Sequence, residues 1–109
     1  MTFAEYQQQS RRFVIYPNPG KNITYPTLGL ANEAGEVAGK VKKVFRDGTG
    51  TATEEECEKI SDEIGDVLWY CAQLATELGC SLEDIAGKNI EKLASRLDRG
   101  KLGGSGDTR

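Results

Sequence analysis

Apolar residues recur at helical spacing through most of the chain, and this pattern predicts four helices. Counted with their capping residues, these helices cover residues 2–14, 27–45, 53–79 and 81–99. Thr2 with Glu5, and Thr53 with Glu56, have the spacing of a capping box, and Ser81 is a typical N-cap residue. The pattern therefore predicts an all-α fold, a bundle of four to five helices.

Residues 15–26, between the first two helices, are predicted to be irregular because proline and glycine interrupt them. The interrupting residues are Pro17, Pro19, Gly20 and Pro26. Tyr16 and Tyr25 lie in the same segment. A loop of this kind either closes over a substrate base or covers an edge of the core, and the sequence leaves both functions open.

Each helix has an apolar stripe that predicts its buried face. In the first helix we expect Phe3, Tyr6, Phe13 and Val14 to be buried. The stripes of the two middle helices are Leu30, Ala34, Val37, Val41 and Val44, and then Ile60, Ile64, Val67, Cys71, Leu74 and Leu78. The break at residues 47–50 has the length of a connection between antiparallel neighbours, so the middle helices should form a central antiparallel hairpin.

One motif occurs in both middle helices, at residues 30–37 and 60–67: aliphatic, any residue, Asn or Asp, Glu, apolar, Gly, acidic, Val. It places Glu33 with Glu36, and Glu63 with Asp66, as pairs three residues apart on a helix surface. With ~100° of rotation per residue, both pairs lie on one flank of the apolar stripe, at ~60° and ~120° from its centre. In an antiparallel hairpin these flanks lie on the same side, at equal distance from the turn. Four carboxylates should therefore converge.

The alternative for these acids is an ordinary solvated helix surface, with Glu36 paired to Lys40 at i,i+4. Two like charges ~4 Å apart repel by ~1 kcal/mol in water and by ~4 kcal/mol at an effective dielectric constant of 20, so a cluster of four favours a bound cation. The chain has no histidine, and Cys57, Cys71 and Cys80 lack metal-ligand spacing. An all-oxygen site formed by the four acids suits Mg²⁺, with Mn²⁺ as a substitute.

The fourth predicted helix carries a polar row beside its apolar stripe. Asn89 falls inside the stripe, and Lys92 and Arg96 lie beside it on the same flank. Phosphate oxygens would satisfy an amide and two cations in such a row. An ordinary basic flank with a satisfied buried Asn89 explains the row equally well.

Composition sets limits on the function. At 109 residues we expect a single domain over residues 1–102, followed by a flexible Gly-rich tail over residues 103–109. A net charge of −3 argues against binding of duplex nucleic acid. The sequence has neither an apolar run of membrane-spanning length nor a signal peptide, which predicts a cytoplasmic protein. The modest size, and the small residues Gly35 and Gly39 opposite the second stripe, make assembly with further copies plausible.

The paired acids, together with Asn89-x-x-Lys92-Leu93 and Arg96, resemble the MazG-like family of all-α nucleoside triphosphate pyrophosphohydrolases. The resemblance covers residues 27–102 and implies hydrolysis of a nucleoside triphosphate or its deoxy form between the α and β phosphates, with Mg²⁺. It further implies metal ligation by the four acids, nucleotide contacts by Asn89, Lys92 and Arg96, and a homodimer or homotetramer. The competing hypothesis is a catalytically inactive helical module that binds nucleotides or a partner protein.

Overall fold

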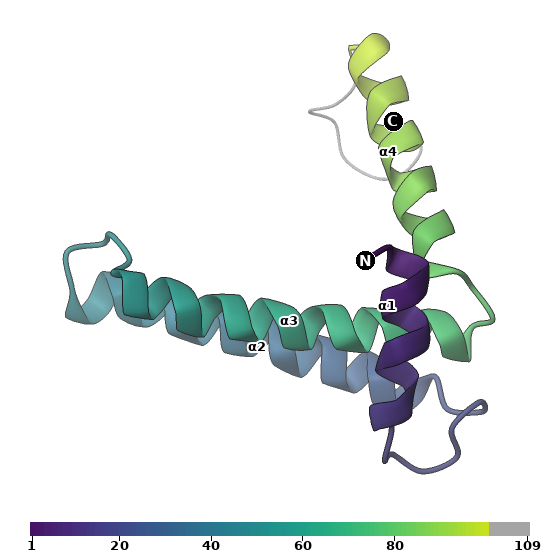
Figure 1. The fold of residues 1–109 in the computed structure, drawn as a ribbon. Coiled ribbons are helices and arrows are strands. Elements are labelled where there is room, and N and C mark those ends of the chain that lie inside the picture. The colour runs from purple at the N-terminus through teal and green to yellow at the C-terminus, as the bar shows by residue number, and fades with distance from the viewer. Residues whose placement is uncertain (101–109) are drawn as a thin grey trace.

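The computed structural model describes residues 1–100, which form four α-helices and one short 3₁₀ helix (Figure 1). Their bounds are α1 Phe3–Ser10, η1 Arg11–Phe13, α2 Thr24–Asp47, α3 Glu54–Glu77 and α4 Leu82–Asp98. The predicted all-α fold is confirmed. The predicted tail, residues 103–109, lies outside the described residues, as do the last two residues of the predicted domain.

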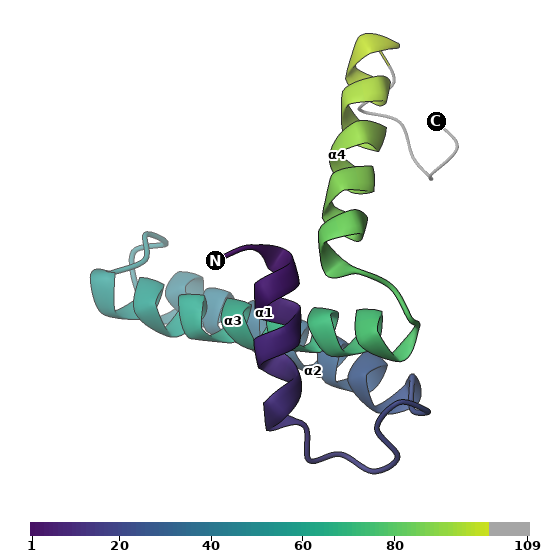
Figure 2. The same cartoon turned by 45° about the vertical axis from the view of Figure 1, so that its right-hand side comes forward.

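Helices α2 and α3 form the predicted antiparallel hairpin, and they lie side by side in both views (Figures 1 and 2). Helix α1 crosses α3 near the end of the hairpin that is remote from its turn, and α4 extends away from this junction. The radius of gyration is 16.7 Å, whereas a compact chain of this length has about 13 Å. The chain by itself is therefore an open arrangement, with α4 packed mainly at its first turn.

The predicted helix starts are confirmed by their hydrogen bonds. Both capping boxes are complete, because the Thr2 and Thr53 hydroxyls accept from the backbone three residues on and the facing glutamates accept in return. The Ser81 hydroxyl accepts from the amide of Asp84 at 3.2 Å. At the end of α3, Gly79 adopts a φ of 71°, a conformation that favours glycine, and the chain then turns into α4.

Helix boundaries differ from the prediction at the end of the first helix and at both ends of α2, which runs to Asp47 instead of Phe45. The first helix becomes a 3₁₀ turn at Arg11 instead of continuing as an α-helix to Val14. Helix α2 begins at Thr24, three residues earlier than predicted, and the Asn22 side chain accepts a hydrogen bond from the Tyr25 amide at 2.9 Å. Pro26 is tolerated there because backbone N–H groups in the first turn of a helix have no partner within the helix.

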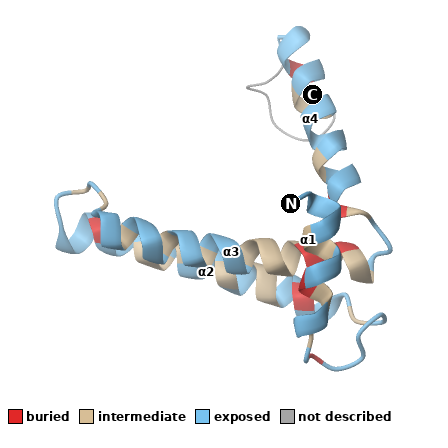
Figure 3. Ribbon diagram, viewed as in Figure 1, coloured by how far each residue is buried: buried red, intermediate tan, exposed pale blue. Residues whose placement is uncertain are grey.

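The core is concentrated where α1, α3 and the start of α4 meet (Figure 3). The prediction of a buried apolar face on the first helix is wrong for Phe3 and Phe13, which are 43% and 58% exposed. The crossing of α1 over α3 instead buries Ser10 and Gln73, and Gln73 Nε2 donates to Ser10 Oγ at 2.8 Å. A short helix that crosses its neighbour buries only the residues at the crossing point, whatever the length of its apolar stripe.

Several apolar side chains of the hairpin and of α4 remain exposed. On the predicted stripes, Ala34, Val41, Ile64 and Leu78 are exposed instead of buried. Each hairpin helix has only one long neighbour along most of its length, so part of its stripe stays uncovered. The exposed apolar residues on α2, α3 and α4 include Leu28, Val41, Phe45, Ile64, Ile90 and Leu97. Among the described residues, no helix is both long enough and apolar enough to span a bilayer.

Candidate metal and nucleotide site

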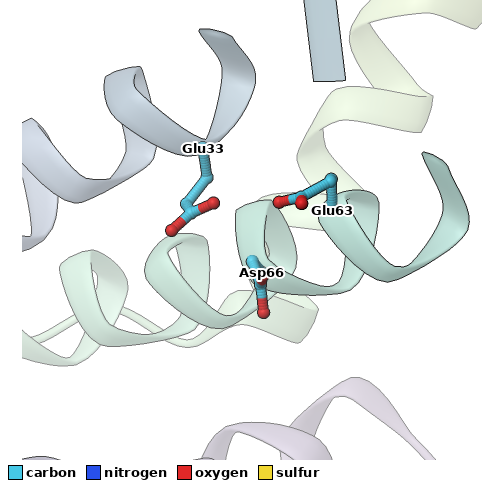
Figure 4. A group of neighbouring side chains, drawn as sticks. All are labelled: Glu33, Glu63 and Asp66. Atoms are coloured by element: carbon cyan, nitrogen blue, oxygen red, sulfur yellow. The ribbon is translucent and has the colours of Figure 1, made fainter. Parts of the chain in front are cut away.

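Three carboxylates converge between the hairpin helices. Glu33 lies on α2, and Glu63 and Asp66 lie opposite on α3 (Figure 4). One carboxylate oxygen from each residue lies within 4.8 Å of the others. The antiparallel hairpin produces this convergence because it places the repeated motif on the same side of both helices and at the same level.

The fourth predicted acid, Glu36, lies one turn further along α2 and is exposed. Its oxygens are not part of the three-residue cluster, although its charge helps to raise the pKa of Glu33. Lys40 pairs across the hairpin with Glu63, with an N–O distance of 3.4 Å. The structure thus brings three of the four predicted acids together, and one of them, Glu63, forms an ion pair with Lys40.

The environment of Glu33 is unfavourable for a carboxylate anion. Partial burial raises its pKa, and the negative charges of Asp66 and Glu63 raise it further. A divalent cation among these oxygens would remove the repulsion. The donor set is all oxygen and suits a hard ion such as Mg²⁺ or Mn²⁺, so the residues present fit the predicted metal.

An aromatic pocket adjoins the acid cluster and shares Asp66 with it. Its volume is about 430 Å³. We call it the aromatic pocket, and its lining residues are Phe13, Ile15, Tyr16, Tyr25, Asp66, Trp69 and Tyr70. The lining combines three segments: the residues after α1, the first turn of α2, and the middle of α3.

A buried glutamate holds the loop that forms one wall of this pocket. The Glu77 side chain has no exposed surface, and its Oε2 accepts from Arg11 Nη2 at 2.8 Å and the Tyr16 hydroxyl at 2.7 Å. The amide of Gly20 donates to the same oxygen at 2.9 Å, and the amide of Asn22 donates to Oε1 at 2.8 Å. Although burial opposes ionisation, these donors lower the pKa of Glu77 to about 2.

Glu77, Gln73, Tyr70 and Trp69 are not among the residues predicted from the sequence, although the sequence contains a signal for the first three. Asp66, Tyr70, Gln73 and Glu77 are spaced four, three and four residues apart, so they continue the acidic flank of α3. This second line of side chains lies beside the apolar stripe of α3 and is not part of it. Gln73 and Glu77 on this line contact α1 and the loop after it. No local pattern in the sequence predicts these contacts.

The predicted phosphate-binding row lies on α4, which extends away from the hairpin (Figure 2). Asn89 is exposed instead of core-facing, Lys92 is partly exposed and Arg96 is buried. Within one chain, the structure does not bring this row to the acid cluster. Its role in binding phosphate stays a prediction.

Comparison with known proteins identifies the family. Residues 23–100 match the model of the MazG nucleotide pyrophosphohydrolase domain. The chain belongs to this family. Gene 37 protein of Mycobacterium phage L5 is similar, with 45% identity over 109 residues, covering 95% of this chain and 96% of the phage protein. No solved structure gives a significant match.

Membership of the MazG family confirms the resemblance found in the sequence and points to a nucleotide pyrophosphohydrolase. It also suggests a nucleoside triphosphate as the class of substrate, and MazG proteins typically depend on a divalent metal. The matched region includes both acid pairs but begins after Phe13, Ile15 and Tyr16. One wall of the aromatic pocket therefore lies outside the residues that match the family model.

Proposed function

We propose that this MazG protein hydrolyses a nucleoside triphosphate, or its deoxy form, between the α and β phosphates. Water is added across the bridging P–O–P bond, and the products are the nucleoside monophosphate and pyrophosphate. The observation that supports this most strongly is the convergence of Glu33, Glu63 and Asp66 within 4.8 Å in a chain of this family.

Glu33, Glu63 and Asp66 would hold Mg²⁺, with Glu36 one turn away as a further ligand. The bound metal would neutralise phosphate charge and lower the pKa of coordinated water. Lys40 restrains the Glu63 carboxylate through their ion pair and adds a positive charge beside the phosphates. Asp66 belongs to the acid cluster and also lines the aromatic pocket, so it lies where the phosphate and nucleoside parts of the substrate would meet.

Assembly into a homodimer or homotetramer is part of the proposal. The exposed apolar side chains on α2, α3 and α4 and the open shape of the single chain support it, because a second copy would cover that surface. Assembly would also allow Asn89, Lys92 and Arg96 on α4 of one copy to approach the acid cluster of another. Their proposed role there is contact with the phosphates or the nucleotide.

The direct test is incubation with a panel of nucleoside triphosphates and Mg²⁺, followed by separate assays for pyrophosphate and orthophosphate. We expect pyrophosphate as the first product, and no turnover when a chelator removes the metal. Glu63→Gln should lower kcat/KM by about 100-fold or more, which corresponds to about 3 kcal/mol of lost transition-state stabilisation. A matched control is Glu55→Gln on the same helix, whose partner Lys59 lies on the exposed surface.

Orthophosphate as the initial product would refute cleavage between the α and β phosphates. Binding of nucleotides without turnover of any of them would instead support the catalytically inactive module. Equal losses in Glu63→Gln and Glu55→Gln would show that the effect does not come from the acid cluster.

A further inference from the structure

A basic pocket adjoins the acid cluster on the side toward the turn of the hairpin. We call it the lysine pocket, and its lining residues are Lys40, Lys43, Glu56, Lys59 and Ile60. Three lysines and one glutamate give this lining a net charge of +2. Its volume is about 210 Å³, which is room for several water molecules or for one small anion.

The hairpin places the lysines on the same flank as the acids. Four charged residues on each helix follow one another at intervals of three, four and three positions, a spacing that keeps them on one helix face. They are Glu33, Glu36, Lys40 and Lys43 on α2, and Glu56, Lys59, Glu63 and Asp66 on α3. Lys40 and Lys59 are equally far from the centre of the turn, as Glu36 and Glu63 are. Two cations therefore lie at one level of the hairpin, next to the level of the acids.

Lys40 links the lysine pocket to the acid cluster. Its ammonium nitrogen lies 3.4 Å from a carboxylate oxygen of Glu63, and Glu63 belongs to the cluster. The pocket therefore begins where the cluster ends, and one ligand can reach both. The aromatic pocket lies beyond Asp66, at the other end of the cluster. The acids thus have an aromatic neighbour on one side and a basic neighbour on the other.

The positive charges of the lysine pocket are accessible to a ligand. The carboxylate of Glu56 is used in the capping box of α3, where its Oε1 accepts from the Thr53 amide at 2.9 Å. Lys59 pairs with Glu55 at 3.1 Å, but both side chains are largely exposed, and exposed pairs of this kind are weak. Lys43 is exposed. An anion with several oxygens can therefore attract the lysine ammonium groups at little cost.

The charge pattern fits a diphosphate group. Such a group has several negative oxygens close together, and lysine ammonium groups bind phosphate as point charges. A triphosphate whose α phosphate lies at the acid cluster has two further phosphates to place. Toward Asp66 and beyond they would meet aromatic side chains, whereas toward Lys40 they would meet cations. Electrostatics favours the second direction.

We propose that the lysine pocket binds the β and γ phosphates of the substrate and holds the same group when it is released as pyrophosphate. Lys43 and Lys59 contact phosphate oxygens, and Lys40 lies between these oxygens and Glu63. The triphosphate then runs along the hairpin, with its γ phosphate nearest the turn. This inference rests on the proposed function for the position of cleavage.

Binding of pyrophosphate itself can be measured without metal and without turnover. Calorimetric titration in metal-free buffer reports the lysines, because the acid cluster without a cation repels an anion. We expect saturable binding that weakens as sodium chloride is added, since salt screens exposed charges. Lys43→Gln and Lys59→Gln should each weaken binding about tenfold through the loss of one close charge. Lys43→Arg keeps the charge and should bind as the native protein does.

Lys42→Gln is the matched control. Lys42 is an exposed residue of α2 next to Lys43 but does not line the pocket, so this variant changes the net charge equally without removing a proposed contact. Its affinity for pyrophosphate should stay close to that of the native protein. Lys43 and Lys59 are also exposed, so their variants should fold, which thermal melts verify.

A second titration separates the phosphates of the substrate from free pyrophosphate. With Mg²⁺ present, Lys43→Gln should weaken binding of a nucleoside triphosphate with a non-hydrolysable α,β-methylene bridge about tenfold, again through the loss of one close charge. A nucleoside monophosphate has no β and γ phosphates, so its affinity should be the same in the native protein and in Lys43→Gln.

The outcomes that would overturn the inference are specific. Equal pyrophosphate affinities in Lys42→Gln, Lys43→Gln and Lys59→Gln would show that the pocket is not an anion site. Weakened pyrophosphate binding with unchanged binding of the triphosphate would overturn the assignment of the β and γ phosphates. If Lys43→Gln weakens both ligands, the assignment stands even when no nucleotide is hydrolysed. Hydrolysis to pyrophosphate with no effect of these variants would give the opposite result, so the two proposals fail separately.

Discussion

Glu77→Gln removes the negative charge on α3 to which Tyr16, Gly20 and Asn22 of residues 16–22 donate hydrogen bonds. The glutamine oxygen can replace Oε2 and accept from Arg11, Tyr16 and Gly20, but its amide group then faces the N–H of Asn22 where Oε1 accepted before. In the opposite orientation, the NH₂ group of the glutamine faces the donors of Arg11, Tyr16 and Gly20. In either orientation at least one part-buried donor loses its acceptor, and Arg11 loses its counter-ion.

The magnitude follows from the pKa of Glu77. The donors lower it from 4.5 to about 2, and at about 1.4 kcal/mol per pKa unit this corresponds to about 3 kcal/mol of stability at neutral pH. Loss of an acceptor costs a fully buried donor about 1–3 kcal/mol, and the part-buried donors here fall toward the lower end of that range. We therefore expect Glu77→Gln to lower the free energy of unfolding by about 2–3 kcal/mol at pH 7.

The pH dependence has a definite sign. Because the pKa of Glu77 is lower in the folded protein than in the unfolded chain, its contribution is complete above about pH 4.5 and is lost as the pH falls toward 2. Urea denaturation of the native protein and of Glu77→Gln at pH 7 and pH 3 measures this. The difference between the two proteins should shrink at pH 3, and taking the difference cancels the titration of the other carboxylates.

Glu55→Gln is the control for this experiment, because its partner Lys59 is on the surface and exposed pairs contribute less than about 1 kcal/mol. A Glu77→Gln protein as stable as the control at pH 7 would refute the role of Glu77. A stability difference that is the same at both pH values would show that shape, and not charge, is what Glu77 contributes.

Other consequences can be checked with the same protein. Glu36→Gln should hold or raise thermal stability in chelator but gain less stability from Mg²⁺ than the native chain; equal Mg²⁺ stabilisation would show that Glu36 is not a ligand. Lys92→Ala should weaken nucleotide binding or turnover while the fold survives, and unchanged kinetics would return Lys92 to an ordinary surface role. Gly29→Ala should lower the melting temperature by its overlap with Tyr70, whereas Gly35→Ala, which has open space around its Cβ, should not. Light scattering should give at least a dimer at micromolar concentration, and a monomer would contradict the proposed assembly.

The sequence by itself determined the local structure of this protein. The capping boxes at Thr2 and Thr53, the turn glycine Gly79 and the helical period act within a few residues, and the structure has all of them. The repeated acidic motif also predicted the meeting of Glu33 with Glu63 and Asp66, because one antiparallel hairpin is enough to bring them together. No contact from outside the hairpin is needed for this part of the site.

Only the tertiary structure decided which faces are covered. Ser10 and Gln73 are buried because α1 crosses α3 at that point, while Phe13 and Ile64 remain exposed although both continue apolar patterns. Glu77 is buried against a loop more than fifty residues earlier in the chain, and the aromatic pocket joins residues from three segments. A helical period states that one face is apolar but not what lies against it, so crossing angles and loop paths decide these contacts.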